Sequence, residues 1–212
     1  MKLQINKFRI FSYLLPLVLF IGFSCSSDDN TIMEDDPISG ESSFTMKIDG
    51  EPWGAHVAHV QTYGGPEWWE EGDEEVYLVA ISASKHEDGT DGAEVEETFT
   101  IHIFIDPSDF NNPIGVYTVP PSTDMQAGAA AAYYTTKNTS FLSVDPENEN
   151  RKVGEVAITS FELGQQIALG MGYINLTGTF EFEIYGANIT TGALLNRTIT
   201  EGSFNIKNLG LD

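Results

Sequence analysis

The sequence predicts an all-β protein: a single antiparallel β-sandwich or partly open barrel of about nine or ten strands, after a signal peptide and a flexible tether. Short segments alternate apolar and polar residues with the period of two that is typical of half-buried strands. Turn-forming residues separate these segments, and no segment sustains helical periodicity. The 212 residues are 41% apolar. That is enough for one sizeable core, and we expect a single folded domain over residues 44–212.

Residues 1–24 have the composition of a secretory signal peptide. Lys2, Lys7 and Arg9 precede a largely apolar segment at 10–23, and these 24 residues contain no acid. The apolar segment is shorter than the ~20 residues that a membrane-spanning helix needs. We therefore expect it to direct export.

Cys25 is the only cysteine, and it directly follows Ser24. This position resembles the bacterial lipobox, in which the signal is cleaved before a cysteine that is then acylated. The resemblance departs from the usual pattern at Gly22, where the box normally has leucine. It implies a lipidated Cys25 and a membrane anchor of two or three acyl chains. The alternative is an ordinary cleaved signal with an incidental cysteine.

Residues 25–43 are predicted to form an acidic, disordered tether behind the lipidated cysteine, because they offer little apolar surface to bury. Asp28 and Asp29 resemble the signal that exports lipoproteins of Bacteroidota-type bacteria to the cell exterior. This favours an outer-membrane lipoprotein that faces outward, and the alternative is one that faces the periplasm. Without the three N-terminal cations, 7 Lys and Arg stand against 32 Asp and Glu. Such an acidic surface repels phosphates, so no nucleic-acid partner is expected.

The first strand is predicted at 44–48, where Phe44, Met46 and Ile48 alternate with polar residues, and Asp49-Gly50 supplies a turn. A second strand is predicted near 54–63. Strands at 76–84 and 96–105 follow. Their inward residues are predicted from the alternation: Tyr77, Val79 and Ile81 in one, and Phe99, Ile101, Ile103 and Ile105 in the other.

Residues 106–113 are predicted to form a loop, because they are rich in proline and other turn-forming residues. A short strand is predicted at 115–119. Propensity favours a helix over the alanines at 127–132, but the segments that follow indicate strands at 133–136 and 141–144. The last strands are predicted at 153–163, 173–185 and 194–206, with a bulge at Gly202. In the second of these, Phe180, Phe182 and Ile184 are predicted to face inward and Glu181 and Glu183 to face water.

Five short motifs resemble a group of small lipoproteins of undefined function from Bacteroidota, and the resemblance spans nearly the whole domain. It implies an all-β secreted domain on a lipid anchor, and it provides no catalytic residues to transfer. The motifs are Phe44-x-x-x-Ile48-Asp49-Gly50-x-x-Trp53, Gly115-Val116-Tyr117, Gly154-Glu155-Val156-Ala157-Ile158-Thr159, Gly178-Thr179-Phe180-x-Phe182 and Ile199-Thr200-Glu201-Gly202-Ser203-Phe204.

The candidate ligand loop is residues 64–75, in which Trp68 and Trp69 lie among six acids. Indole faces beside carboxylates suit sugar rings, which stack their C–H faces and donate hydroxyl hydrogen bonds. The alternative, which we favour, is that one tryptophan folds back to close the core.

No other constellation predicts chemistry. The acidic loop from Glu87 to Glu94, which Glu96 and Glu97 follow, lacks calcium-loop spacing, and a solvated loop explains it better than a calcium site does. His56 and His59 lie three apart on a strand, so they point to opposite faces and cannot share a metal. Glu181 and Glu183 are better explained as outward-facing charges of a strand than as the carboxylate pair of a glycosidase.

We therefore expect no enzyme, cofactor or metal, but a lipid-anchored binding or accessory module that engages a glycan or an envelope protein. The alternative is a surface protein that captures or processes glycans.

Overall fold

The computed structural model describes residues 42–63, 76–87, 94–120, 126–148, 151–163, 173–188 and 191–207. All described residues belong to one compact unit, Ser39–Asp212. These residues are all-β, as predicted, and none of them forms a helix that is long and apolar enough to cross a membrane. The strands are β1 (Ser43–Ile48), β2 (Glu51–Gly54), β3 (Val57–Tyr63), β4 (Tyr77–His86), β5 (Val95–Ile105), β6 (Gly115–Thr118), β7 (Ala130–Thr136), β8 (Ser140–Leu142), β9 (Gly154–Leu163), β10 (Tyr173–Ala187) and β11 (Leu194–Lys207).

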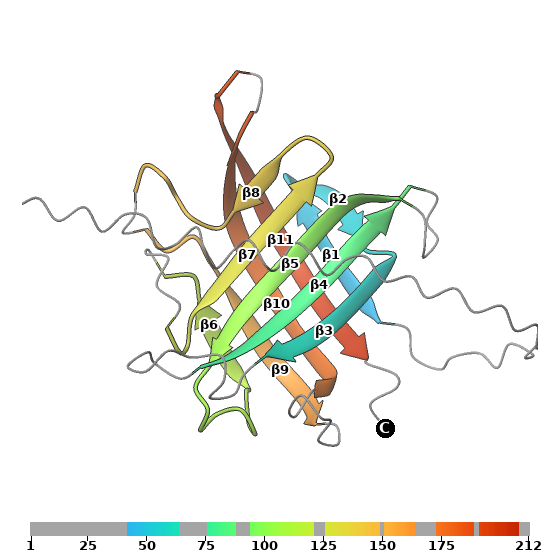
Figure 1. Cartoon of the computed structure of the whole chain (residues 1–212), viewed down its shortest axis with the longest axis vertical. Helices are drawn as coiled ribbons and strands as arrows, with labels where there is room; N and C mark the ends of the chain where they lie inside the picture. The colour runs from blue at the N-terminus through green and yellow to red at the C-terminus, as the bar shows by residue number, and fades with distance from the viewer. Residues whose placement is uncertain are drawn as a thin grey trace, which may run out of the picture. The chain divides into compact units, whose positions relative to one another are not determined.

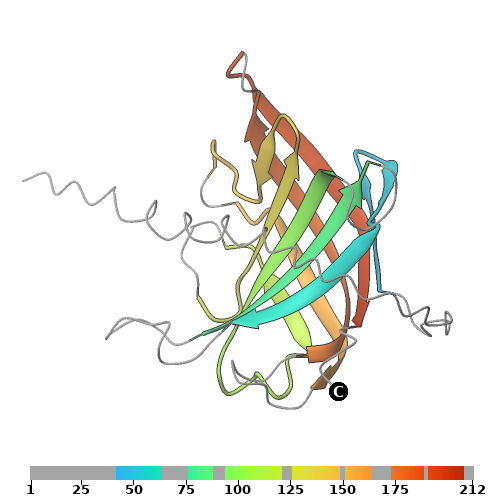
Figure 2. The same ribbon diagram turned by 45° about the vertical axis from the view of Figure 1, so that its right-hand side comes forward.

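The strands pair antiparallel in one sheet that curls into a half-barrel (Figure 1 and Figure 2). Nine strands follow the order β2-β1-β11-β10-β8-β7-β5-β4-β3, and β9 and β6 branch from β10. One edge of β10 pairs with β11, while β9 and β8 share its other edge. The sheet therefore divides at β10, and side chains from its two parts meet inside the half-barrel.

β2 and β3 stand at opposite ends of this strand order, and the chain links them directly through Ala55 and His56. Asp49 and Gly50 form the predicted turn, with the φ angles of 53° and 86° that a type I′ turn requires, and the turn pairs β2 with β1. The amide of Ala55 donates to β1, whereas the next amide, that of His56, donates to β4. The strand predicted near 54–63 is β3, and Glu51–Gly54, which was not predicted to be a strand, forms β2. The described residues therefore contain eleven strands.

The core lies on the inner face of the sheet. Phe44, Phe99 and Phe180 come from β1, β5 and β10, and their ring centroids lie between 5.0 and 5.8 Å apart. All three side chains are buried, as are the other inward residues predicted for β5 and β10. The alternation in the sequence therefore identified this core correctly.

Four glycines of the sheet lie directly opposite a phenylalanine of the neighbouring strand. A Cβ atom at any of them would lie less than 3.0 Å from the partner strand, so the absence of a side chain lets each ring pack over the backbone. The register also shifts beside Gly202, and Glu201 has a φ of 51°, as a bulge there requires. The pairs are Gly154 with Phe182, Gly178 with Phe204, Gly202 with Phe180 and Gly186 with Phe141.

The outward face of β5 is also buried at two positions. Phe104 is 4% exposed and packs with Val76 and Ala129. His102 is 7% exposed, and its ring lies 4.9 Å from that of Tyr133. Burial lowers the pKa of His102 to about 4, so the folded protein holds a neutral imidazole at neutral pH.

Candidate functional site

The inner face of the half-barrel changes from apolar to polar at one end, where the β1–β2 turn lies (upper end in Figure 1). Side chains alternate along a strand, so Glu97 continues the inward series of Phe99 in β5, and Thr136 continues that of Tyr134 in β7. Glu97 and Thr136 are directly paired across the two strands. Arg197 lies two residues before the inward Ile199 of β11. Several strands thus bring polar side chains together above the core.

These residues line a pocket of about 370 Å³. The lining residues come from six strands and the turns between them, and Ile48, Phe141 and Leu195 are among the apolar ones. The lining residues are Ile48, Asp49, Glu51, Pro52, Trp53, Glu97, Tyr134, Thr136, Thr139, Phe141, Leu195 and Arg197.

The Glu97 carboxylate is held by two aromatic side chains. The Trp53 indole N–H and the Tyr134 hydroxyl, which donates over 2.8 Å, both bond to Oε2. Burial raises the pKa of Tyr134, and the hydrogen bond to Glu97 and the charge of Glu97 raise it further, so the phenol is a donor at neutral pH. Among the described residues, no donor bonds to Glu97 Oε1. The Oε1 oxygen of this fixed carboxylate is therefore available to a ligand.

An ion pair forms the rim of the pocket. Arg197 Nη1 lies 2.6 Å from Asp49 Oδ2, and the Thr198 amide donates to Asp49 Oδ1 over 2.9 Å. Burial alone would raise the pKa of the Asp49 carboxyl, but these two donors outweigh it and hold the pKa below its usual value. The Arg197 guanidinium also lies 6.0 Å from the centroid of the Phe141 ring. Its side chain is 47% exposed, so a ligand can reach it from solvent.

The chemistry of this pocket is that of recognition. It offers a fixed acceptor in Glu97, a fixed planar donor in Arg197, the hydroxyl of Thr139 and apolar contact surface, whereas the Thr136 hydroxyl is already bonded within its own turn. A concave site with few convergent polar groups is the usual form of a small-molecule pocket.

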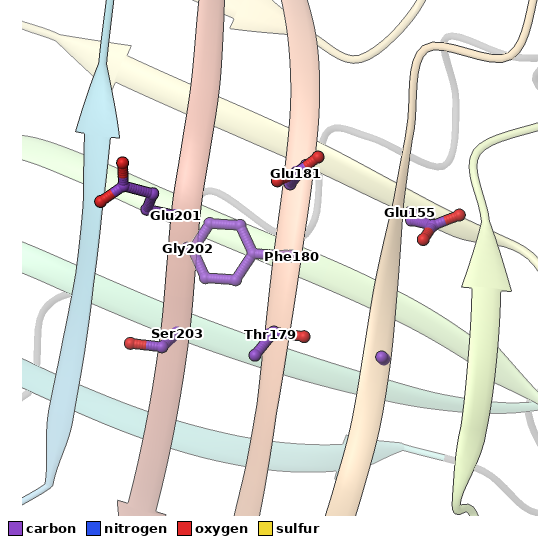
Figure 3. Close-up of a pocket in the computed structure, with 8 residues that line it drawn as sticks. Glu155, Thr179, Phe180, Glu181, Glu201, Gly202 and Ser203 are labelled. Carbon is purple, nitrogen blue, oxygen red and sulfur yellow. The ribbon is translucent and has the colours of Figure 1, made fainter. Parts of the chain in front are cut away.

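A second depression lies on the outward face of β9, β10 and β11, over Phe180 and Gly202 (Figure 3). Glu155, Glu181 and Glu201 project from three different strands there. Lys152 pairs with Glu155 and Lys47 with Glu201, each over 2.7 Å. Within the described part of the chain, no group of three or more His, Cys, Asp or Glu residues is arranged to hold a metal. These acids form an open charged surface.

Glu183 belongs to a network that attaches the segment after β8 to β10. The Arg151 guanidinium pairs with Glu183, donates to the Tyr185 hydroxyl over 2.9 Å and contacts Asp145 at 3.4 Å. The Tyr185 hydroxyl donates to Glu183 over 2.8 Å. Burial and Glu183 raise the pKa of Tyr185 to about 12. Glu183 thus has a structural partner, whereas Glu181 is exposed as predicted.

The predicted site residues Cys25, Trp68 and Trp69 lie outside the described residues. Tyr63 and Val76, the described residues that flank 64–75, lie at the end of β3 and beside the start of β4. This is the end of the sheet opposite the pocket, since these strand ends pair with each other and with the end of β5.

Glu97 lies in β5, within the strand predicted at 96–105. The sequence analysis did not predict that it would be half-buried, with its carboxylate bonded to two aromatic side chains. Sequence reasoning also missed Trp53, Tyr134 and Arg197 as parts of a site. One signal for Glu97 was available in the sequence. Glu97 lies two residues before Phe99, so the alternation of the strand places both side chains on the inward face. Comparison of the chain with protein-family models, curated proteins and solved structures gives no significant match. Function must therefore be inferred from the residues of this chain.

Proposed function

We propose that this protein is a lipid-anchored outer-membrane lipoprotein that faces the exterior and acts as a binding module, with its ligand in the pocket around Glu97. The observation that supports binding is the Glu97 carboxylate, held on one oxygen by Trp53 and Tyr134 while its other oxygen accepts no bond from the described residues. Arg197 and Asp49 at the rim add a second fixed polar group. Such preorganised groups favour binding, because little freedom is lost when a ligand docks.

The first and last described residues, Ser42 and Lys207, lie together at one end of the half-barrel. The Lys207 amide donates to the Ser42 hydroxyl over 2.9 Å, so the start of β1 and the end of β11 lie together. The pocket lies beyond the other end of β1, a strand of six residues that spans about 20 Å. The residues before Ser42 therefore join the domain at the end of β1 that is away from the pocket.

The anchor is tested by labelling cells with a radioactive fatty acid. The Cys25→Ala variant is expected to incorporate no label, whereas the neighbouring Ser26→Ala variant is labelled like the wild type. Persistent labelling of Cys25→Ala would disprove the anchor. Surface location is tested by protease treatment of intact cells. A chain that survives this treatment but is cut after release by detergent faces the periplasm instead.

The alternative function is capture or processing of glycans through Trp68 and Trp69, and it is favoured by the six acids around these indoles in residues 64–75. A glycan array separates the alternatives. Binding that is lost in Trp68→Ala and Trp69→Ala places the ligand on this loop, whereas binding unaffected by both changes excludes the loop.

A further inference from the structure

We propose that the pocket around Glu97 binds the end of a neutral saccharide, whose hydroxyl groups donate to Glu97 and accept from Arg197. This inference rests on the proposed binding function and specifies the ligand class. It follows from the charges that line the pocket, from the groups that already occupy its aromatic faces, and from its size.

The charge of the pocket disfavours an anionic ligand. Asp49, Glu51 and Glu97 line it, and Arg197 is the one cation among the described lining residues. Asp49 already neutralises Arg197 at 2.6 Å. An anion would therefore meet a net negative surface, and it would have to compete with Asp49 for the guanidinium.

An apolar ligand is disfavoured by Glu97. Such a ligand would exclude water from Oε1 and offer no donor in its place. Burying an unpaired charged group costs far more than the apolar contacts of one small ligand gain.

An organic cation is disfavoured because cations of the chain already lie over two of the three aromatic rings among the described residues that line the pocket. Arg197 lies 6.0 Å from the centroid of Phe141, and Lys85 lies 5.9 Å from that of Trp53. Cation binding in an aromatic pocket depends on a free ring face near the charge. An ammonium group would therefore find the faces of both rings already in contact with a cation.

A neutral saccharide satisfies all of these groups. Each hydroxyl both donates and accepts, so neighbouring hydroxyls can bond to Glu97 Oε1 and to Arg197. The sugar C–H groups would contact the apolar wall of Ile48, Phe141 and Leu195. The volume of about 370 Å³ is near the lower limit for small-molecule pockets, which fits a terminal sugar better than a longer segment.

The test measures binding of the full-length, detergent-solubilised protein to an array of neutral, acidic and amino-terminated oligosaccharides, followed by calorimetric titration of each hit. The variants are Glu97→Gln and Arg197→Met, with Glu181→Gln as the matched control, because Glu181 is an exposed carboxylate outside the pocket. Thr139→Trp places a bulky side chain at the pocket from a surface turn and provides a steric block that leaves the Glu97 bonds intact. Melting temperatures establish that each variant is folded.

We expect binding to a neutral saccharide that is weakened at least about tenfold in Glu97→Gln and in Arg197→Met, as expected for loss of one hydrogen bond to a charged group. Thr139→Trp should abolish binding, and Glu181→Gln should leave it unchanged. Binding that depends on Glu97 but is confined to acidic or amino sugars overturns this inference and leaves the binding function of the pocket standing. Binding lost only in Trp68→Ala and Trp69→Ala overturns both, because it places the ligand on residues 64–75. If a thermal-shift screen of small molecules also finds no ligand whose effect depends on Glu97, the pocket has no binding role and both proposals fail.

Discussion

Replacing Gly178 by alanine is expected to destabilise the protein strongly, because there is no room for a side chain at this position. A Cβ atom would lie 2.2 Å from the backbone oxygen of Ala157 and 2.4 Å from the ring of Phe204. Ordinary Cβ contacts begin at 3.4 Å, so the oxygen is more than 1 Å too close. The oxygen cannot rotate away, because Ala157 belongs to the ladder between β9 and β10. The clash must be relieved by moving a strand.

Overpacking a well-packed core costs typically 1–3 kcal/mol, and a required backbone shift places Gly178→Ala at about 3 kcal/mol or more. In a domain of this size, this lowers the melting temperature by roughly 6–12 °C. Urea denaturation followed by circular dichroism measures the change. Gly54→Ala is the matched control, because its Cβ would lie 3.9 Å from Thr45 and should change stability by less than about 1 kcal/mol.

A double variant separates the two parts of the clash. Phe204→Leu removes ring atoms from the Gly178 site, so Gly178→Ala should cost less in that background than in the wild type. The contact with the Ala157 oxygen persists, so the rescue should be partial. Equal denaturation midpoints for Gly178→Ala and Gly54→Ala would refute the packing of phenylalanine over glycine.

Three further predictions concern pH, a turn and a loop. The pKa of His102 is about 4 when folded and 6.5 unfolded, so the unfolded state binds more protons between these values. Stability is therefore full above pH 6.5 and falls by about 3 kcal/mol toward pH 4, a slope that His102→Gln should reduce in denaturation curves. Gly50→Ala should cost roughly 1–2 kcal/mol in the same assay, because its φ is 86°. Asp145 Oδ1 accepts the amides of Glu147 and Asn148, so Asp145→Ala should accelerate their hydrogen exchange about tenfold.

The fold could be predicted because each strand shows its burial in its own alternation. The main omission, β2 at Glu51–Gly54, has a physical cause: the period of two shows which face of a segment is buried but does not show with which strand the segment pairs. The change of partner between Ala55 and His56 depends on the curl of the whole sheet. At 127–132, helix propensity was correctly overruled. Part of this segment pairs with β5, and tertiary pairing outweighs propensity.

The pocket could not be predicted from composition or from local motifs. Trp53 and Tyr134 are 44 and 37 residues from Glu97, and only the half-barrel brings the three together. Acidic neighbours such as Glu94 and Glu96 made Glu97 resemble one more solvated charge. Only its position two residues before Phe99, on the inward face, distinguished it locally. A single polar residue at an inward position is a weak signal unless neighbouring strands also change from apolar to polar residues on that face.

Trp53 and Tyr134 connect the core to the pocket. Trp53 packs edge-on against Phe44, with centroids 6.1 Å apart, and the ring of Tyr134 lies 6.1 Å from that of Phe99. Their apolar bodies complete the last layer of the core, while the indole N–H and the phenol reach Glu97. An apolar residue in place of Glu97 would extend the core and leave both donors without an acceptor. The carboxylate therefore satisfies the two buried donors and at the same time ends the core, so the pocket begins where the packing of the half-barrel requires an acceptor.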